Sequence, residues 1–418
     1  MTAAARAFAP APTEDPARES AASEGRTEAL AETLADLAAA SAERDRARLQ
    51  PFAEVERLKA LGFGALRLPA PEGAGASLRQ VIAAVVDLAE ADANIAHVFR
   101  NHFTFVERFL IGAPDDPRRG WRAAVRDGAL VGLANTELDR AQTGGAAGFK
   151  TALIPEGDGY RLTGTKYYST GALYADLLLT RATTPEGRTA SVVLPADRAG
   201  IARVDDWDGI GQRVTGSGTT TFDAVRVEAH EAIFDDEAPA FLLPYASTLA
   251  QVIVTAIEAG ILRAVLRDGR ALLRGRSRNF YFAPAARAAE DPLLLRALGA
   301  IATDAFAAEL AVLAAAEALD RVAEARAAGA DAGDLDALSH DAALVAAKAK
   351  VIVDELALRS ANALFDLGGA SAAGRERNLD RHWRNARTLA SHNPAAYKAQ
   401  AIGAWEATET PLPKLGFF

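Results

Sequence analysis

The chain has no cysteine among its 418 residues, so disulfides, thiolate zinc sites and catalytic thiols are excluded. It shows no uninterrupted run of about 20 apolar residues, the length that a membrane-spanning helix needs. The net charge of −9 comes without a basic face or tail, which argues against nucleic acid as a partner. No P-loop occurs, and no glycine pattern follows a strand as a dinucleotide-binding loop would.

The N-terminal residues 1–27 lack the apolar centre of a signal peptide and mix alanine, proline, glutamate and arginine. We expect a disordered tail there and a cytoplasmic protein of bacterial type. A chain of 418 residues is too long for one compact core, and about two to three domains are expected.

Three regions with different patterns follow the tail. Residues 28–127 repeat apolar side chains at a helical period, for example Leu30, Leu34 and Leu37. Residues 128–235 alternate short β-branched runs with turns, which is typical of a β-sandwich or open barrel. Residues 236–418 return to long Ala- and Leu-rich helices that predict a bundle. The expected class is α+β, a β domain between two helical domains, and the large apolar helical faces predict a homo-oligomer.

A further absence concerns carboxylates near the end of the chain. None lies between Asp380 and Glu406, although residues 378–394 are rich in arginine and histidine. This basic helix ends just before Pro394, which places the imidazole of His392 on a rigid turn with no acid beside it in sequence. The lack of an acid limits the chemistry that this segment can perform.

Three segments of the β region carry hydroxyls, amides and aromatic rings at strand ends. Residues 133–137 include Asn135 and Thr136, and residues 164–171 include Tyr168, Ser169 and Thr170. Residues 207–219 include Trp207 and Arg213. A planar heteroaromatic ligand needs stacking on its face and hydrogen bonds along its edge, and these residue types provide both.

In this order the segments resemble the acyl-CoA dehydrogenase fold family, over nearly the whole chain from about residue 28. Residues 136–137 and 164–170 stand where that family's flavin-lining motifs stand, and residues 211–217 match its Gly-x-Arg-x-Ser motif. Leu367, Gly368 and Gly369 match the Leu-Gly-Gly before its last helices. The resemblance implies an N-terminal helical domain, a middle β domain, a C-terminal four-helix-type bundle and a homotetramer.

Departures from the dehydrogenase pattern are informative. Aligning the family's last motif puts Asn393 where its catalytic glutamate would stand, and a neutral amide cannot act as a general base. The alternative base position of some relatives falls on Ala250 or Gln251, and neither is acidic. Glu258, about two turns further on, remains as a weak candidate base.

The basic helix and the Asp-Asp-Trp-Asp-Gly segment instead resemble the branch of dibenzothiophene monooxygenases and sulfur-acquisition oxidoreductases. The resemblance implies that reduced flavin arrives from a separate reductase and reacts with O2 to give a C4a-hydroperoxide. Oxygen then passes to a sulfur or nitrogen atom of a small-molecule substrate. Reduced FMN is expected, FAD is the alternative, and no metal is implied.

This resemblance assigns roles to individual residues. Ser169 and Thr170 would supply hydroxyls near flavin N5, and His392, with His102, would hold or protonate the distal oxygen, since imidazole titrates near the working pH. The remaining residues expected to bind the cofactor are Asn135, Thr136, Tyr168, Trp207, Arg213, Arg276, Arg278, Gly368 and Gly369. Of these, Arg276 or Arg278 would contact a terminal phosphate, because residues 276–280 only loosely match the family's adenine-binding Arg-x-Gln-Phe.

The other histidines carry no predicted chemistry. His97 is expected to be structural and to face away from His102, and His382 to form a salt bridge or interface contact. His230 and His340 receive no role. Two rival functions stay open: an acyl-CoA dehydrogenase that uses Glu258, and a degenerate family member without catalysis.

Overall fold

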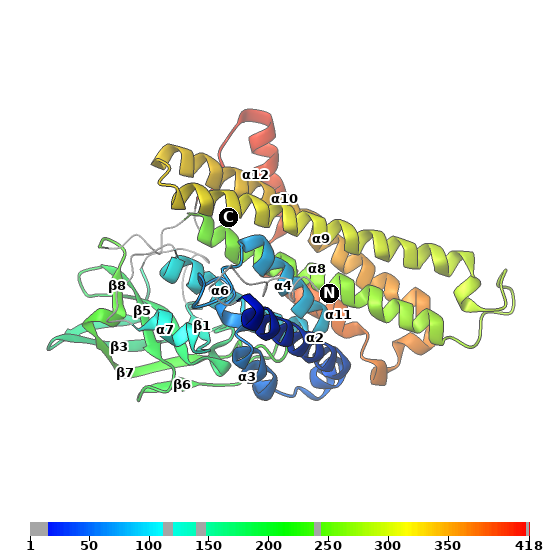
Figure 1. The fold of residues 1–418 in the computed structure, drawn as a ribbon, viewed down its shortest axis with the longest axis horizontal. Helices are drawn as coiled ribbons and strands as arrows, with labels where there is room; N and C mark the ends of the chain where they lie inside the picture. Colours follow the sequence, from blue (N-terminus) through cyan, green and yellow to red (C-terminus); the bar gives the residue numbers. More distant parts are fainter. Residues whose placement is uncertain (1–15, 112–119, 139–147, 238–243, 415–417) are drawn as a thin grey trace.

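A computed structural model describes residues 16–111, 120–138, 148–237, 244–414 and 418. It contains an N-terminal group of helices, a central sheet and a group of long C-terminal helices (Figure 1). The predicted tail of residues 1–27 was placed too far along the chain, because helix α2 already begins at Pro16. Residues 1–15 lie outside the described part. Alanine, glutamate and arginine favour helix, and proline is tolerated in a first helical turn.

Side chains cap the starts of two helices in the N-terminal group. Ser77 and Gln80 form a reciprocal capping box at the start of α4, and Asp92 caps α5 through the backbone of residues 94 and 95. The elements are α2 (Pro16–Ala47), α3 (Phe52–Ala60), η1 (Phe63–Ala65), α4 (Leu78–Ala91), α5 (Ala93–Val98), α6 (Arg100–Phe105), the π-helical turn η2 (Val106–Ile111) and α7 (Trp121–Arg126).

One eight-stranded sheet makes the middle region. Its strands are β1 (Val131–Ala134), β2 (Ala152–Glu156), β3 (Gly159–Lys166), β4 (Leu177–Thr183), β5 (Thr189–Pro195), β6 (Ile201–Arg203), β7 (Thr220–Glu228) and β8 (Ala232–Phe234). The order is β6-β7-β3-β2-β4-β5-β8, with β1 parallel to β4. The pairings are otherwise antiparallel except for a short parallel contact between β2 and β4. Short helical turns η4 (Ala172–Tyr174) and η5 (Ala229–Glu231) connect strands.

The C-terminal bundle consists of α8 (Pro244–Gly275), α9 (Pro292–Ala327), α10 (Ala332–Gly368), α11 (Asp380–Ala390) and α12 (Ala395–Thr408), with turns η7 (Ala288–Glu290), η8 (Gly369–Ala373) and η9 (Arg375–Arg377). Its buried side chains continue without a break into those of α2, α4 and α5. Gly260 allows this contact, because a Cβ there would lie 2.4 Å from the Cβ of Ala89. The predicted helical domains therefore share one core.

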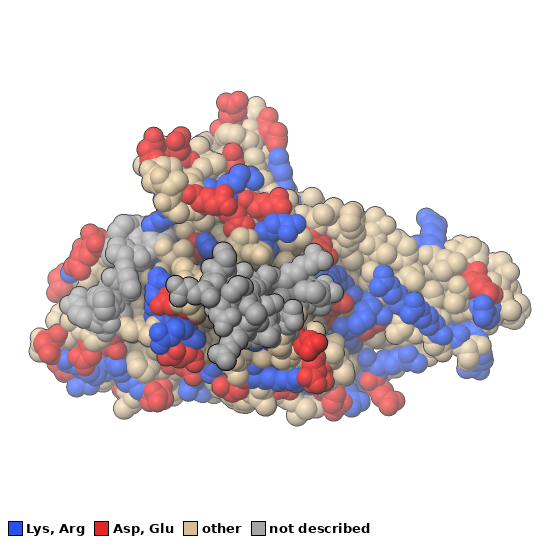
Figure 2. Space-filling model, viewed as in Figure 1, with Lys and Arg blue, Asp and Glu red and all other residues tan. Residues whose placement is uncertain are grey.

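Helices α8 and α9 are long and apolar enough to cross a membrane by length and composition, although polar residues interrupt their apolar stretches. The most apolar stretch of α8 is 83% buried within the bundle. That of α9 is only 22% buried, and Phe306 and Leu310 are exposed on this helix. Few charged side chains cover the upper edge of the molecule over α9 (Figure 2). This face fits the expected oligomer contact.

Candidate functional site

The loop after β1 is fixed by a buried ion pair. The carboxylate of Glu137 accepts hydrogen bonds from Lys166 Nζ at 2.8 Å, from Thr151 and from the backbone of Lys150. Burial opposes ionisation, yet these donors lower the pKa of Glu137 to about 2. The loop is thus held rigid, and Asn135 Oδ1 is buried with no hydrogen-bond partner in the described part of the chain.

The loop after β3 lies beside it, because Tyr167 N–H donates to Thr136 O at 2.8 Å. Ser169 N–H donates to Gly218 O, and Asn101 Nδ2 donates to Thr170 O at 3.1 Å. The hydroxyl of Thr170 is engaged by Ser217 at 2.9 Å. That of Ser169 is buried and meets no partner among the residues described. Of the two predicted hydroxyls, that of Ser169 is the one without a partner among the described residues.

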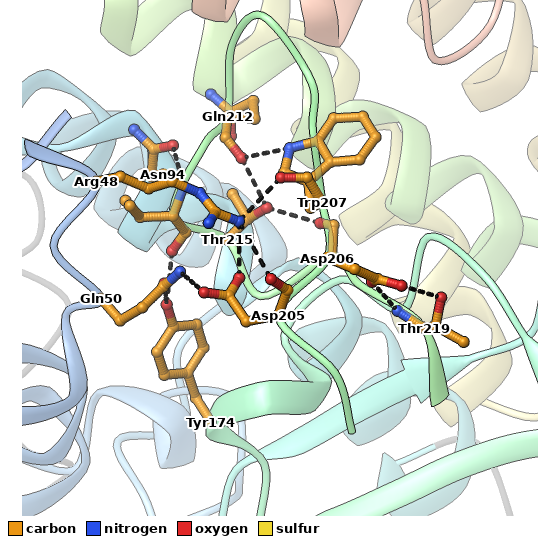
Figure 3. A network of polar contacts seen from close by, with 12 residues as sticks. Arg48, Gln50, Asn94, Tyr174, Asp205, Asp206, Trp207, Gln212, Thr215 and Thr219 are labelled. Atoms are coloured by element: carbon orange, nitrogen blue, oxygen red, sulfur yellow. Dashed lines mark hydrogen bonds and ion pairs between the residues drawn. The ribbon is translucent and has the colours of Figure 1, made fainter. Parts of the chain in front are cut away.

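A third loop, residues 205–219, is hydrogen-bonded to Arg48, the residue that follows α2 (Figure 3). Arg48 donates to Asp205 Oδ1 and to Trp207 O, each at 3.0 Å. The indole of Trp207 donates to Gln212 O at 3.0 Å and packs edge-on against Tyr168, with ring centroids 5.8 Å apart. The structure thus brings together the two aromatic rings expected to form a flavin wall.

Arg213 of the same loop, which was predicted to bind the cofactor, contacts α2 within this chain. Its guanidinium donates to the backbone carbonyl of Asp45 at 2.8 Å, at the end of α2. This hydrogen bond holds the loop of residues 205–219 against the N-terminal helices.

His97 belongs to the site, contrary to the expectation that it is purely structural. Its Nδ1 lies 3.0 Å from Gln212 Oε1, so Nδ1 carries the hydrogen and Nε2 is an acceptor. Burial, with the charge of Arg100, lowers the pKa of His97 to about 3, and the imidazole is neutral. Neither His97 Nε2 nor Gln212 Nε2 has a hydrogen-bond partner in the described structure.

His392 joins the same group of polar side chains through a hydrogen bond with Arg100. Its Nε2 accepts from the Arg100 guanidinium at 3.0 Å, which leaves Nδ1 as the protonated nitrogen. Burial, Arg100 and His97 hold the pKa of His392 well below its usual value. The predicted reason for its choice, an imidazole that titrates near the working pH, is therefore wrong: His392 is a neutral hydrogen-bonding group.

The position of the dehydrogenase base holds an amide pair. Asn393 Nδ2 donates to Gln251 Oε1, so both predicted base positions contact each other without any carboxylate. Asn393 Oδ1 is buried and finds no partner in the part of the chain that the structure describes. This pair can orient a ligand by hydrogen bonding, but it cannot remove a proton.

The surviving base candidate, Glu258, lies inside the bundle. Its side chain is fully buried on α8, near the ion pair of Lys350 and Asp354, whose atoms approach to 2.8 Å. Burial raises the pKa of Glu258 well above its usual value. A carboxyl enclosed by helices, whose charged form burial disfavours, is poorly placed to act as a base on a substrate.

His102 has a structural role, and its predicted contact with oxygen is corrected. Nε2 lies 2.9 Å from Gly64 O, and Nδ1 accepts from Val131 N–H at 3.1 Å. Both ring nitrogens are occupied, and burial lowers the pKa to about 4. His102 therefore joins α6 to the turn η1 and to strand β1.

The predicted phosphate-binding residues are together, but far from the loops of the β domain. Arg276 donates to Leu367 O at 3.2 Å and lies beside Gly369, while Arg278 is exposed. The segment that follows α8 is at the opposite end of the molecule from the sheet (Figure 1). Within one chain, Arg276, Arg278, Gly368 and Gly369 therefore lie far from the loops of the β domain.

Comparisons with known proteins agree with this geometry. The acyl-CoA dehydrogenase C-terminal domain family matches residues 252–396. The "Probable FMNH2-dependent monooxygenase SfnC" of Pseudomonas putida is 31% identical over 396 residues, covering 92% of this chain and 96% of that protein. The chain belongs to the flavin-dependent monooxygenase branch of the acyl-CoA dehydrogenase fold family. It is thus grouped with oxidoreductases, as its sequence predicted.

Two solved structures share the whole fold of this branch member. TdsC of Paenibacillus sp. A11-2, a dibenzothiophene monooxygenase, was crystallised with FMN and indole. It superposes with a TM-score of 0.83 at 29% identity, covering 93% of this chain and 99% of TdsC. The methanesulfinate monooxygenase MsuC of Pseudomonas fluorescens gives 0.83 at 27% identity, covering 94% and 99%. The predicted fold is confirmed.

His97 was expected to be structural, and neither Arg100 nor Gln212 was predicted as a site residue. The first two are three positions apart on consecutive short helices, a spacing that places side chains on one face. Their partners lie 115 and 292 positions away, so local pattern could not reveal the contacts. Only the unusual content of residues 97–102, two histidines and an arginine, signals a polar patch.

Proposed function

We propose that this protein is a two-component flavin monooxygenase. It uses reduced FMN from a separate reductase and O2, through a flavin C4a-hydroperoxide, to oxygenate an organosulfur or amine substrate. One observation carries the proposal: the amide pair of Asn393 and Gln251 replaces a carboxylate, beside the neutral imidazoles of His97 and His392. A site without a strong base suits an oxygenating flavin and fails a dehydrogenase.

The residues present fit a flavin. Asn135 Oδ1, Ser169 Oγ and His97 Nε2 are buried polar atoms without partners in the described structure, as expected where a ligand supplies them. The rings of Tyr168 and Trp207 provide an aromatic wall. Bound reduced FMN supplies two electrons and the carbon that reacts with O2.

FMN is favoured over FAD by the loop after α8. Asn279 stands where the family's adenine-binding pattern has glutamine, and its Nδ2 donates to Ala285 O at 3.0 Å and to Asp291 at 2.9 Å. An amide held within its own loop offers little to an adenine. We propose that Arg276 or Arg278 of a second copy contacts the single phosphate of FMN. Within one chain, both arginines lie at the opposite end of the molecule from the sheet.

The chain's own groups hold the reacting atoms and keep water out. Ser169 Oγ can donate toward the ring edge, His97 Nε2 can accept a hydrogen, and His392 Nδ1–H can donate without gaining charge. All three side chains are buried or nearly so. Exclusion of water strengthens such hydrogen bonds and slows the loss of a reactive oxygen species to solvent.

The proposal is tested by supplying reduced FMN through a flavin reductase under 18O2 with a panel of sulfides, sulfinates and amines. Transfer of one labelled oxygen atom to a product is expected, as judged by mass spectrometry. The dehydrogenase alternative predicts instead that octanoyl-CoA bleaches oxidised flavin bound to the protein without oxygen. Bleaching by octanoyl-CoA, together with no labelled product, would overturn the proposal.

A further inference from the structure

Arg100 is a buried cation whose hydrogen-bond partners are neutral. The side chain is on α6 and the residue is only 8% exposed. Its Nε donates to the backbone carbonyl of Ala250 at 3.2 Å, and a terminal nitrogen donates to His392 Nε2 at 3.0 Å. Neither acceptor carries a negative charge.

The other buried arginines each have an acid close by. Arg44 pairs with Asp92, Arg181 with Asp235, and Arg381 with Asp268. Arg108 is stabilised by the charge of Asp235. Within the described residues, Arg100 is the one buried arginine for which no acidic partner or attracting carboxylate is found. Burial of an unpaired charge is costly, so such a group normally has a functional reason.

The guanidinium nevertheless stays charged at neutral pH. Burial lowers the pKa of Arg100 to about 10, still well above the physiological range. His97 and His392, the two imidazoles whose pKa the charge of Arg100 lowers, are both neutral. The surroundings of Arg100 therefore carry a net positive charge that an anionic ligand would balance.

The side chain of Arg100 points away from the loops that are expected to line the flavin. The next residue, Asn101, donates to Thr170 O on the flavin-lining loop after β3. Successive side chains on a helix differ by about 100° in direction. Arg100 consequently points toward α8 and His392, on the side of Asn393 and Gln251 rather than toward Ser169.

We propose that Arg100 binds the negatively charged group of the substrate, and that this substrate is an organosulfur oxyanion of the alkanesulfinate class. The inference rests on the proposed function and chooses among its substrates. A guanidinium fork matches two oxygen atoms of one oxyanion. Neutral sulfides, sulfones and thiophenes would leave the positive charge of Arg100 without a counterion.

A sulfinate also provides the atom to be oxidised. Its sulfur retains a lone pair, which attacks the electrophilic oxygen, and the O–O bond breaks. One atom of O2 joins sulfur, converting RSO2⁻ to RSO3⁻, while the other leaves as water with two hydrogens and two electrons from reduced FMN. The substrate and the product both carry one negative charge, so Arg100 keeps its counterion throughout.

Three probes of similar size separate charge from shape: methanesulfinate, methanesulfonate and the neutral dimethyl sulfone. Their binding to the protein with oxidised FMN is measured by calorimetry, without turnover. Both anions should bind and the sulfone should not. Arg100→Gln should weaken anion binding on the order of tenfold to a hundredfold, and Arg100→Lys should weaken it less. Arg46→Gln, which alters an exposed arginine on α2, is the control and should bind as the parent does.

Circular dichroism and affinity for reduced FMN are measured for each variant. If Arg100→Gln weakens binding of reduced FMN but leaves the anions unaffected, Arg100 serves the flavin and the inference is overturned. It is also overturned if dimethyl sulfone binds as tightly as methanesulfinate. If labelled oxygen entered a neutral sulfide and no anion bound, the monooxygenase function would stand. The proposal that the substrate is a sulfinate would then be rejected. Anion binding that depends on Arg100 would support the site even if no labelled product formed.

Discussion

The imidazole of His97 is held by the side chain of Gln212, with 3.0 Å between Nδ1 and Oε1 across 115 positions of sequence. Gln212 is itself fixed, because its N–H donates to Asn385 Oδ1 at 2.6 Å and its carbonyl accepts from Trp207 at 3.0 Å. The contact joins the N-terminal helices, the β domain and α11 at one point. It fixes the orientation of the His97 ring, whose Nε2 has no partner among the described residues.

Gln212→Ala should disturb catalysis more than stability. Without the amide, His97 can rotate or change tautomer, so more reduced FMN should be consumed per product formed. We expect the fraction of oxygen released as H2O2 to rise several-fold, measured with a peroxide-coupled assay at saturating reduced FMN. Gln212→Glu, which keeps an acceptor for Nδ1–H, is the matched comparison. Equal peroxide release from the parent and Gln212→Ala would reject the positioning role.

His102→Ala should act on stability. The substitution leaves Gly64 O and Val131 N–H without their partner, and a buried unsatisfied polar group costs about 1–3 kcal/mol. Thermal unfolding should therefore begin at a lower temperature, while FMN affinity below the transition stays near that of the parent. Intact stability with lost oxygenation would instead support the original prediction that His102 contacts oxygen.

Because two histidines are buried and neutral, we expect the free energy of unfolding to fall in acid. The pKa values of His97 and His102 are lowered by burial to about 3 and about 4, below the value of about 6.5 in an unfolded chain. Between these limits the unfolded state binds more protons, so stability falls as pH drops from about 6.5 toward about 4. Each histidine contributes up to about 1.4 kcal/mol per pH unit.

This pH dependence is measured by chemical denaturation from pH 7.5 to 4.5. His97→Asn should flatten the decrease, because the substituted side chain cannot take up a proton. A slope that His97→Asn leaves unchanged would mean that His97 is not a buried neutral imidazole in the folded protein.

A site shared between two copies predicts complementation. His392→Ala removes one residue of the candidate site, and Arg276→Ala removes the proposed phosphate contact, which lies at the other end of the molecule from the sheet. Each variant alone should be poorly active. Oligomers formed from both chains should recover activity, because some sites combine an intact His392 with an intact Arg276. No recovery in mixed oligomers, confirmed as mixed by mass spectrometry, would show that each site uses one chain.

Much of the fold could be predicted, because helical periods, strand alternation and caps are local. Ser77, for example, is of a residue type typical of helix starts, and it forms a capping box. The start of α2 was missed, because a composition that resembles a disordered tail is also rich in helix formers. The shared core of the helical regions depends on contacts such as Gly260 with Ala89, which sequence pattern does not show.

Candidate site residues that lie in short motifs were predicted. Those whose contacts join distant segments of the chain were missed. Ser169, Asn135, Tyr168 and Trp207 lie in loops that the motifs marked. His102 was chosen over His97 although both are on adjacent short helices, because the choice depends on which ring nitrogens find partners. Those partners are backbone groups for His102 and the side chain of Gln212 for His97.

The central claim is that bound reduced flavin reacts with O2 to form a protected oxygenating species. The direct measurement is anaerobic binding of reduced FMN, followed by rapid mixing with oxygenated buffer while the flavin spectrum is recorded. The account predicts a transient species, distinct from both reduced and oxidised FMN, that decays faster when methanesulfinate is present. Direct conversion to oxidised flavin without an intermediate, with tight binding of oxidised FAD instead, would contradict it.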